Sequence, residues 1–348
     1  MHAFVTGANG LLGSNLVHQL VQQGHRVTAL VRSRQRAGAT LGGLDVTLVE
    51  GDVRDVTRYG AALEGCDTLF HTAAYFREYY TVGDHWATLK GTNIDATVAL
   101  LEEAERRGVR RAVHTSSSGV IGRRPGGGAS DESDGPDTAA MSNLYFRSKV
   151  LAEEAVHTFL GRSSLPVMMI LPGWMFGPGD AAPTSAGQIT LDFLNRKLPG
   201  VFPGGGAPVD VRDVAQAMIA ASERGRSGER YIVSGNRYVT MATIFRTLEE
   251  VSGVPAPRLP VPAPAALFYG WASEQYTRLT GKPALATVAG VRTLLEMHSM
   301  SSDKAVRELG VTFRPLRETL RDQVAWFRAH TPERLTASGR RAAPSLEA

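Results

Sequence analysis

The chain has 348 residues, of which 43% are hydrophobic and 21% charged, so it can bury the core of one large α/β unit or of two domains. The formal net charge of +4 at pH 7 is compatible with nucleic-acid binding, but the arginines are scattered along the sequence and we expect no nucleic-acid partner. Cys66 is the single cysteine, which excludes an internal disulfide framework and fits a reducing, cytoplasmic compartment.

The first 175 residues alternate between short apolar runs that are typical of strands and segments with a helical period. The run 2–6, for example, is followed by Leu12, Leu16 and Leu20, which lie one helical turn apart. Such alternation predicts a doubly wound parallel sheet of the Rossmann type, which binds its ligand at the carboxyl ends of the strands. Strands are expected at 2–6, 25–31, 45–52, 66–74, 110–117 and 165–172, and helices at 11–23, 84–107 and 144–160.

Loops and helices dominate after residue 175. We expect helices at 188–197, 209–225 and 240–253, the last capped by Thr240, and a strand at 228–235. The acidic, glycine-rich segment 126–137 is expected to be a surface loop. The domains predicted from this pattern are a dinucleotide-binding domain (1–172, joined by about 209–235), a smaller and mostly helical substrate domain (173–208 and 236–330) and a flexible tail (331–348).

The sequence shows no pattern for three further features: a signal peptide, a membrane span and a metal site. No signal peptide is indicated, since the run 2–6 already reads as a strand and no basic segment precedes it. The longest apolar stretch, 261–272, is too short and too rich in proline to span a bilayer, so we expect no membrane partner. No spacing of His, Cys and Asp residues indicates a metal site.

A glycine turn, TGANGLLG at residues 6–13, follows the first expected strand and opens the first expected helix. In a dinucleotide fold Gly7 would allow the tight turn, Gly10 would let the backbone approach a pyrophosphate, and Gly13 would let the helix pack closely on the strand. The phosphates would lie at the helix N-terminus, where free N–H groups favour negative charge. A packing turn without a ligand is the alternative interpretation.

Arg32 stands at the end of the second expected strand, where an acidic residue would bind the ribose of NAD. Arg34 and Arg36 follow it closely. Because a guanidinium suits a 2′-phosphate, this sequence favours NADP(H) over NAD(H), although ordinary solvated loop charges would look the same.

Tyr145 and Lys149 form a YxxxK motif on an expected helix, so their side chains project from the same face one turn apart. A tyrosine with a pKa near 10 is a poor acid–base group at neutral pH until a nearby ammonium stabilises its phenolate. Ser117 ends the fifth expected strand, from which its hydroxyl can hydrogen-bond a substrate oxygen. These three residues predict carbonyl reduction or alcohol oxidation.

With these motifs the sequence resembles the extended short-chain dehydrogenases/reductases, and within them the dihydroflavonol 4-reductase and cinnamoyl-CoA reductase branch. The motifs are TGANGLLG, GDV at 51–53, HTAA at 71–74, TSSSG at 115–119, YFRSK at 145–149 and LPGWMFGPGD at 171–180, with weaker support from VDVRDVA at 209–215. The resemblance implies Ser117 (or a neighbouring serine), Tyr145 and Lys149 as catalytic residues. It implies cofactor contacts at Gly7, Asn9, Gly10, Leu11, Leu12, Gly13, Arg32, Asp52, Val53, Thr72, Ala73, Ala74, Asn93, Thr115, Tyr145, Lys149, Pro172 and Gly173.

Substrate is expected beside aromatic residues that follow the fourth and sixth strands, with core packing as an equal alternative for each. The expected substrate contacts are Tyr75, Ser117, Ser118, Trp174 and Met175. Plant flavonoid enzymes carry a substrate-binding asparagine five residues after the catalytic serine, and Gly122 stands there instead, so a dihydroflavonol is not the expected substrate. Asn93 could equally be a polar residue on a helix surface, and His71 a hydrogen-bonded strand end.

The function predicted is an NADPH-dependent reductase of a small, hydrophobic aldehyde or ketone. A nucleotide-sugar epimerase, a hydroxysteroid-type dehydrogenase using NAD, and a non-catalytic NADP sensor are the alternatives. The resemblance also makes a homodimer possible, through helices near 84–107 and 144–160.

Overall fold

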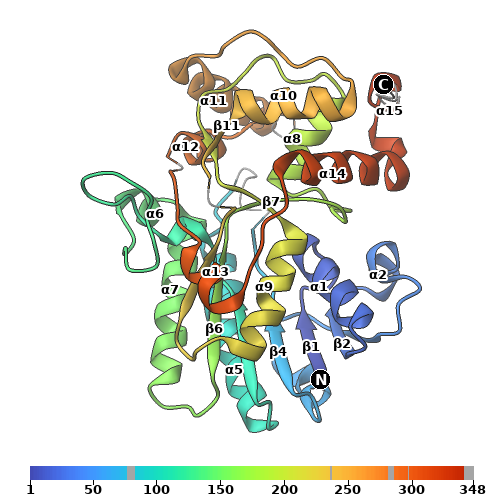
Figure 1. Ribbon diagram of the computed structural model, residues 1–348, viewed down its shortest axis with the longest axis vertical. Coiled ribbons are helices and arrows are strands. Elements are labelled where there is room, and N and C mark those ends of the chain that lie inside the picture. Colours follow the sequence, from blue (N-terminus) through green and yellow to red (C-terminus); the bar gives the residue numbers. More distant parts are fainter. Residues whose placement is uncertain (77–82, 236, 281–285, 297, 341–348) are drawn as a thin grey trace.

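The computed structural model describes residues 1–76, 83–235, 237–280, 286–296 and 298–340, and its core is a seven-stranded parallel sheet (Figure 1). The strand order is β10-β6-β5-β4-β1-β2-β3. This order confirms the doubly wound arrangement, in which the chain reverses direction across the sheet between β1 and β4. The strands are β1 His2–Thr6, β2 Arg26–Val31, β3 Thr47–Glu50, β4 Thr68–His71, β5 Arg111–Thr115, β6 Val167–Pro172 and β10 Arg230–Val233.

Alternate residues of each strand supply two separate cores, one on each face of the sheet. On β1, Ala3 and Val5 join the first core and Phe4 the second. The first core also holds α1 Leu11–Gln22, α2 Arg34–Leu41, α9 Val211–Arg224 and α13 Asp303–Leu309. The second holds α3 Val56–Tyr59, η1 Gly60–Leu63, α5 Ala96–Arg106 and α7 Leu144–Leu160. Both faces are therefore covered, as near-continuous apolar strands require.

A third core lies in a smaller lobe above the carboxyl ends of the strands (Figure 1). Its main helices are α8 Ser185–Leu194, α10 Met241–Ser252 and α14 Leu316–His330. Two small sheets connect it to the sheet domain: β7 Trp174–Phe176 with β9 Pro208–Asp210, and β8 Gly205–Gly206 with β11 Val239–Thr240. The other elements are α4 Trp86–Leu89, η3 Lys90–Asp95, η4 Ser118–Val120, α6 Thr138–Ser142, α11 Ala263–Thr280, α12 Val288–Glu296, η5 Pro332–Arg334 and α15 Ala337–Arg340.

Two segments differ from their expected domain. Helix α13, expected in the substrate domain, packs on the sheet instead, because Ala305, Leu309 and nearby Val311 are buried in the first core. Residues 331–340, expected in a flexible tail, form η5 and α15 against the upper lobe, where Leu335 is 2% exposed and belongs to the third core. The rest of that expected tail, 341–348, lies outside the described residues.

Two further expected segments, 209–225 and 126–137, differ in part from the structure. The segment 209–225 begins as the end of β9, and Asp210 caps α9 by accepting a hydrogen bond from the backbone N–H of Arg212. The acidic loop 126–137 is only partly a surface loop, since Ser130 is fully buried and pairs with Met300. No helix in the described part of the chain combines the length and apolarity needed to cross a membrane.

Candidate active site

The glycine turn adopts the backbone that its sequence predicts. Gly7 has φ +65°, and a Cβ there would come within 2.7 Å of the backbone nitrogen of Ala73. A Cβ at Gly13 would lie 2.2 Å from the carbonyl oxygen of Gly7, so this glycine allows α1 to pack tightly on the turn. Both positions therefore require glycine for steric reasons.

Gly10 is the N-cap of α1, and the face of the turn around it is open. A Cβ on Gly10 would meet only the Gly7 carbonyl oxygen, at 3.2 Å, so the side toward the cleft is free of protein atoms. The first turn of α1 contains no acidic residue, which leaves its N–H groups and dipole available to an anion. The turn has the geometry of a pyrophosphate site.

The far end of the cleft is formed after β2 and β3. Arg32 is exposed, and no hydrogen bond or ion pair of its side chain is found within the described residues. Asp52 is paired with Arg54 through two hydrogen bonds of 2.9 and 2.8 Å, and this pairing lowers the pKa of the Asp52 carboxyl to about 2. The Arg32 charge contributes to the same decrease. An ionised carboxylate and a free guanidinium thus flank the expected adenosine end.

Glu50 is an acidic residue in this region that the sequence analysis missed. Its carboxylate accepts a hydrogen bond of 3.1 Å from the backbone N–H of Arg34 at the start of α2. Helix α2 itself was not predicted, and Ser33 caps it with a bond to the N–H of Arg36. A negative charge therefore sits at the helix N-terminus beside Arg32, where a 2′-phosphate would have to compete with it.

A chain of hydrogen bonds runs beneath the cleft through His71, at the end of β4. The hydroxyl of Thr6 accepts from the N–H of Ala73 at 3.3 Å and lies 2.7 Å from His71 Nδ1. On the other side, His71 Nε2 lies 3.0 Å from the hydroxyl of Thr97, which donates to the carbonyl of Asn93. Because the Thr97 proton is used, His71 Nε2 must carry the proton and Nδ1 must accept from Thr6.

His71 is therefore a neutral imidazole with one tautomer, as its burial also demands. Burial and the nearby Lys149 charge lower the pKa of His71 to about 3. The prediction that His71 is a hydrogen-bonded strand end is correct. The same group connects the loop after β4 with the helix that carries Asn93.

Asn93 does not line the cleft, although we expected it among the cofactor contacts. It is fully buried in the π-helical turn η3, where its side-chain oxygen accepts from the N–H of Tyr75 at 2.8 Å. Its amide donates to the Tyr75 carbonyl at 3.1 Å and to the hydroxyl of Ser148 at 2.9 Å. Asn93 thus joins the loop after β4 to α7 from behind the wall of the cleft.

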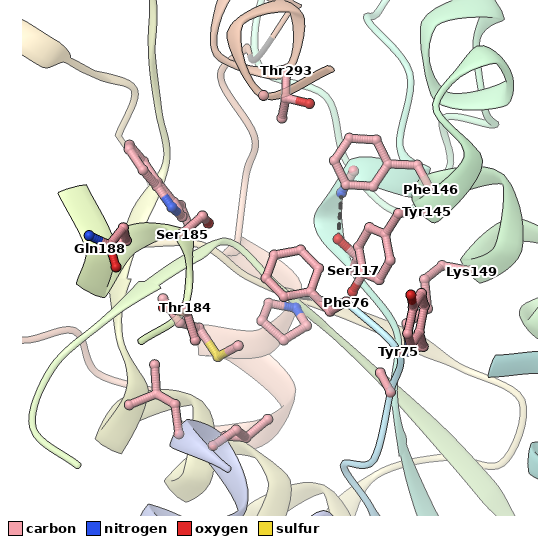
Figure 2. A pocket seen from close by; sticks show the side chains of 18 of the residues that line it. Tyr75, Phe76, Ser117, Tyr145, Phe146, Lys149, Thr184, Ser185, Gln188 and Thr293 are labelled. Carbon is pink, nitrogen blue, oxygen red and sulfur yellow. Dashed lines mark hydrogen bonds between the residues drawn. The ribbon is translucent and has the colours of Figure 1, made fainter. Parts of the chain in front are cut away.

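Tyr145 and Lys149 project from the first turns of α7 into the same cavity as Ser117 (Figure 2). Asn143 starts this helix by accepting from the N–H groups of Tyr145 and Phe146. The Lys149 ammonium is 1% exposed and donates to the carbonyl oxygen of Thr115 at 2.8 Å. Burial lowers the pKa of Lys149 to about 8, although the Glu153 carboxylate opposes the change.

Two of the three consecutive serines after β5, Ser116 and Ser117, have different hydrogen-bond partners. Ser116 donates a short hydrogen bond to the buried carboxylate of Glu153, which also pairs with Arg230. Ser117 caps the short helix η4 by accepting from the N–H of Gly119 at 3.2 Å, which leaves its hydroxyl proton available to another acceptor. The hydroxyl proton of Ser116 is thus engaged with Glu153, and Ser117 is better able to donate to a substrate.

A single cavity of about 970 Å³ contains both the cofactor side and the substrate side. The upper lobe closes it with mostly apolar residues, including Trp174, Met175 and Phe245. The Phe76 ring lies 4.7 Å from the Tyr145 ring. Figure 2 shows Thr184, Ser185 and Gln188 across this space from Tyr145, and the sequence analysis had missed these polar residues of α8 and its N-cap.

With the exception of Asn93, all expected site residues line this cavity. Gly122 does not line it, and a Cβ there would lie 2.7 Å from the Asp137 backbone nitrogen, so no asparagine could replace it without movement. Tyr79 and Tyr80, two of the aromatic residues that follow the fourth expected strand, lie outside the described part of the chain. No cluster of His, Cys, Asp or Glu able to hold a metal ion occurs in the part that is described.

The model of the NAD dependent epimerase/dehydratase family matches residues 3–234. The chain is 36% identical over 330 residues to sterol demethylase protein B of Methylococcus capsulatus, covering 94% of this chain and 98% of that protein. It is 33% identical over 331 residues to a Synechocystis protein provisionally named dihydroflavonol 4-reductase, covering 94% of each. The crystal structure of gox2253 matches with a TM-score of 0.80 and 32% identity, over 96% of this chain and 99% of that one. The chain therefore belongs to the NAD dependent epimerase/dehydratase family of extended short-chain dehydrogenases/reductases and resembles its dihydroflavonol 4-reductase branch.

Proposed function

We propose that this protein is an NADPH-dependent reductase that transfers hydride to the carbonyl of a small, hydrophobic aldehyde or ketone, with Tyr145 as the proton donor. The observation that carries the proposal is the meeting of Ser117, Tyr145 and the buried Lys149 in one cavity whose opposite wall is apolar. In support, relatives of this chain are named as a dihydroflavonol 4-reductase and a cinnamoyl-CoA reductase, and the family is named for its dependence on NAD.

The residues at hand fit a dinucleotide. The open face of the glycine turn around Gly10 and the free N-terminus of α1 would hold the pyrophosphate. Asp52 and Val53 would border the adenosine, and Pro172 and Gly173 would lie against the nicotinamide. The reduced nicotinamide supplies the hydride when it is bound.

The chain's own groups handle the carbonyl oxygen. Ser117 would donate a hydrogen bond to it, and Tyr145 would transfer its phenolic proton as the carbonyl carbon accepts hydride, so that the product is an alcohol. The Lys149 ammonium, one helical turn from Tyr145, would stabilise the phenolate that remains. Asn93 and His71 would keep the loop and helix around these groups in place.

The choice of NADP(H) rests on Arg32. Its exposed guanidinium, without a partner in the described residues, can form charge-assisted bonds with a 2′-phosphate. Glu50 at the start of α2 works against this choice, because its negative charge suits the ribose hydroxyls of NAD. We place Arg32 first because it lines the cavity, whereas Glu50 does not.

A hydroxysteroid-type dehydrogenase that uses NAD is the second candidate. Two observations favour it: the position of Glu50, and the 36% identity with a protein named for sterol demethylation. A nucleotide-sugar epimerase would need cationic groups for a diphosphate, and among the described lining residues of the upper lobe Lys197 is the one lysine or arginine.

The test is loss of nicotinamide absorbance with NADPH and with NADH, against aromatic and aliphatic aldehydes, ketones and acyl-CoA thioesters. The Tyr145→Phe variant is the control, since it keeps the ring and removes the proton. We expect turnover with NADPH that falls at least about 100-fold in this variant. Tight cofactor binding without turnover of any carbonyl would contradict the reductase function, and faster reduction with NADH would favour the second candidate.

A further inference from the structure

Asp192 is a buried carboxylate in the wall of the substrate cavity, and the function proposed above gives it no role. It lies on α8 and is 8% exposed. It stands one helical turn after Gln188, which faces Tyr145 across the cavity (Figure 2). The lining that the upper lobe contributes includes the apolar residues Trp174, Phe202 and Phe245, and also Lys197.

The carboxylate of Asp192 has one hydrogen-bond partner among the described side chains. Its Oδ1 accepts one hydrogen bond of 3.0 Å, from the side-chain amide of Gln188. No hydrogen bond to Oδ2 and no ion pair of Asp192 is found among the described residues. Burial accordingly raises the pKa of Asp192, and the Lys197 ammonium offsets only part of this effect. The Oδ2 atom is not among the enclosed polar atoms of the described residues, so it is open to the cavity and to a ligand bound there.

The usual structural roles of an aspartate in a helix are filled by other residues. Thr184 caps α8 by accepting from the N–H of Gly187, and the neighbouring Asp180 holds the turn before it. The buried face of α8 is formed by Leu191, Phe193 and Leu194 in the third core. Asp192 is thus neither a cap nor a core residue, and its remaining open side is the cavity.

We propose that Asp192, held by Gln188, is the specificity residue that accepts a hydrogen bond from a hydroxyl group at the end of the substrate remote from the carbonyl. This inference rests on the proposed reductase function. It narrows the substrate class to elongated, apolar carbonyl compounds with a hydroxyl at the opposite end. The hydroxyl would donate to the accessible Oδ2, and the apolar walls would enclose the body of the molecule.

A hydroxyl fits this position better than an ammonium group. The positive charge of Lys197 already acts on Asp192, and a cationic substrate end would be repelled by it. A carboxylate end would be repelled by Asp192 itself. A neutral donor meets neither penalty.

The experiment compares matched ketones that differ only in the remote group. A para-hydroxyphenyl alkyl ketone, its methyl ether and its aminomethyl analogue are assayed with NADPH, together with a hydroxy-decalone and its methyl ether. We expect the wild-type kcat/KM to favour the hydroxyl compound over the ether by about 10- to 100-fold, as a bond to a charged acceptor predicts. Asp192→Leu should abolish the preference, and Asp192→Asn should reduce it.

Thr190→Val is the matched control. Thr190 lies on the same helix, is fully buried and donates to Gln323 rather than facing the cavity, so the substitution disturbs α8 without touching the proposed contact. Its hydroxyl-to-ether ratio should equal that of the wild type. A ratio that collapses in this variant as well would overturn the assignment to Asp192.

Calorimetric binding of the same compounds to the cofactor-loaded protein separates this inference from the proposed function. If no ketone is reduced but the hydroxyl compound still binds more tightly than the ether, and Asp192→Leu removes the difference, the reductase function fails and the Asp192 site stands. If ketones are reduced without any hydroxyl preference, the Asp192 site fails and the function stands. Tighter binding of the aminomethyl analogue would overturn the choice of a hydroxyl.

Discussion

Replacement of Lys149 by methionine tests whether the buried ammonium of this lysine destabilises the folded, cofactor-free protein. Burial lowers the pKa of this lysine from 10.5 to about 8. The folded chain therefore binds its proton less tightly than the unfolded chain does. The cost is fully present below pH 8, falls as the pH rises toward 10.5, and is absent above that value.

The size of the effect follows from two opposing terms. At about 1.4 kcal/mol per pH unit, the lowered pKa of Lys149 destabilises the folded protein by about 3 kcal/mol at pH 7. Methionine removes this cost but leaves the Thr115 carbonyl without the donor that now lies 2.8 Å away, which costs about 1–3 kcal/mol. Lys149→Met should therefore be close to neutral at pH 7. Near pH 10.5 it should be destabilised by about 3 kcal/mol more than at pH 7.

Urea unfolding of the cofactor-free protein at pH 7 and pH 10.5 measures this difference. Lys90→Met makes the same substitution at an exposed lysine that pairs with Asp95, and its effect should be small at both values. A Lys149→Met effect that is the same at both pH values would refute the reasoning, because the cost would then not arise from the buried ammonium. Turnover should be lost in this variant whatever its stability.

Further predictions concern the cofactor side of the cleft. Arg32→Ala should raise the Kd of NADPH by about 10- to 100-fold and change that of NADH little, while Glu50→Gln should tighten NADPH binding; fluorescence titration measures both. Gly13→Ala should lower the unfolding free energy by about 3 kcal/mol or more, since its Cβ would lie 2.2 Å from a carbonyl oxygen. Gly38→Ala is the control, because this helical glycine has open space around it. It should be neutral or stabilising in the same thermal melts. His71→Phe should weaken NADPH binding, and because the pKa of His71 is lowered to about 3, it should lose less stability than the wild type as the pH falls below 6.5. An acid-unfolding curve identical to that of the wild type would contradict the neutral, buried imidazole.

The parts of the fold that depend on local pattern could be predicted from the sequence. The strand and helix periods led to the parallel sheet, since both faces of its strands are buried and read as apolar runs. The glycine turn and the YxxxK motif also lie within single short segments. Their roles follow from backbone geometry and helical spacing, which neighbouring residues determine.

The features that depend on contacts between distant segments could not be predicted from the sequence. Asn93 was expected to contact the cofactor, but its position is decided by Tyr75 and Ser148, 18 and 55 residues away. Leu335 was placed in a flexible tail because a single leucine in a polar segment carries no period, and only the third core explains its burial. Asp192 was not predicted as a site residue, because the residues next to it in the sequence do not indicate that it lines the cavity.

Two buried histidines lie at the carboxyl ends of the central strands β4 and β5, where the core accepts polar groups that it avoids elsewhere. His71 and His114 occupy paired positions, their rings are 5.2 Å apart, and the pKa of each is lowered by burial and by the Lys149 charge. An acidic residue at either position would bind the Lys149 ammonium and raise its pKa, and a cation would repel it. Neutral imidazoles fill this volume without competing for the lysine. The His114 ring nitrogens have no hydrogen-bond partner among the described residues, so a neutral environment beside Lys149 comes with two unsatisfied polar atoms in the layer beneath it.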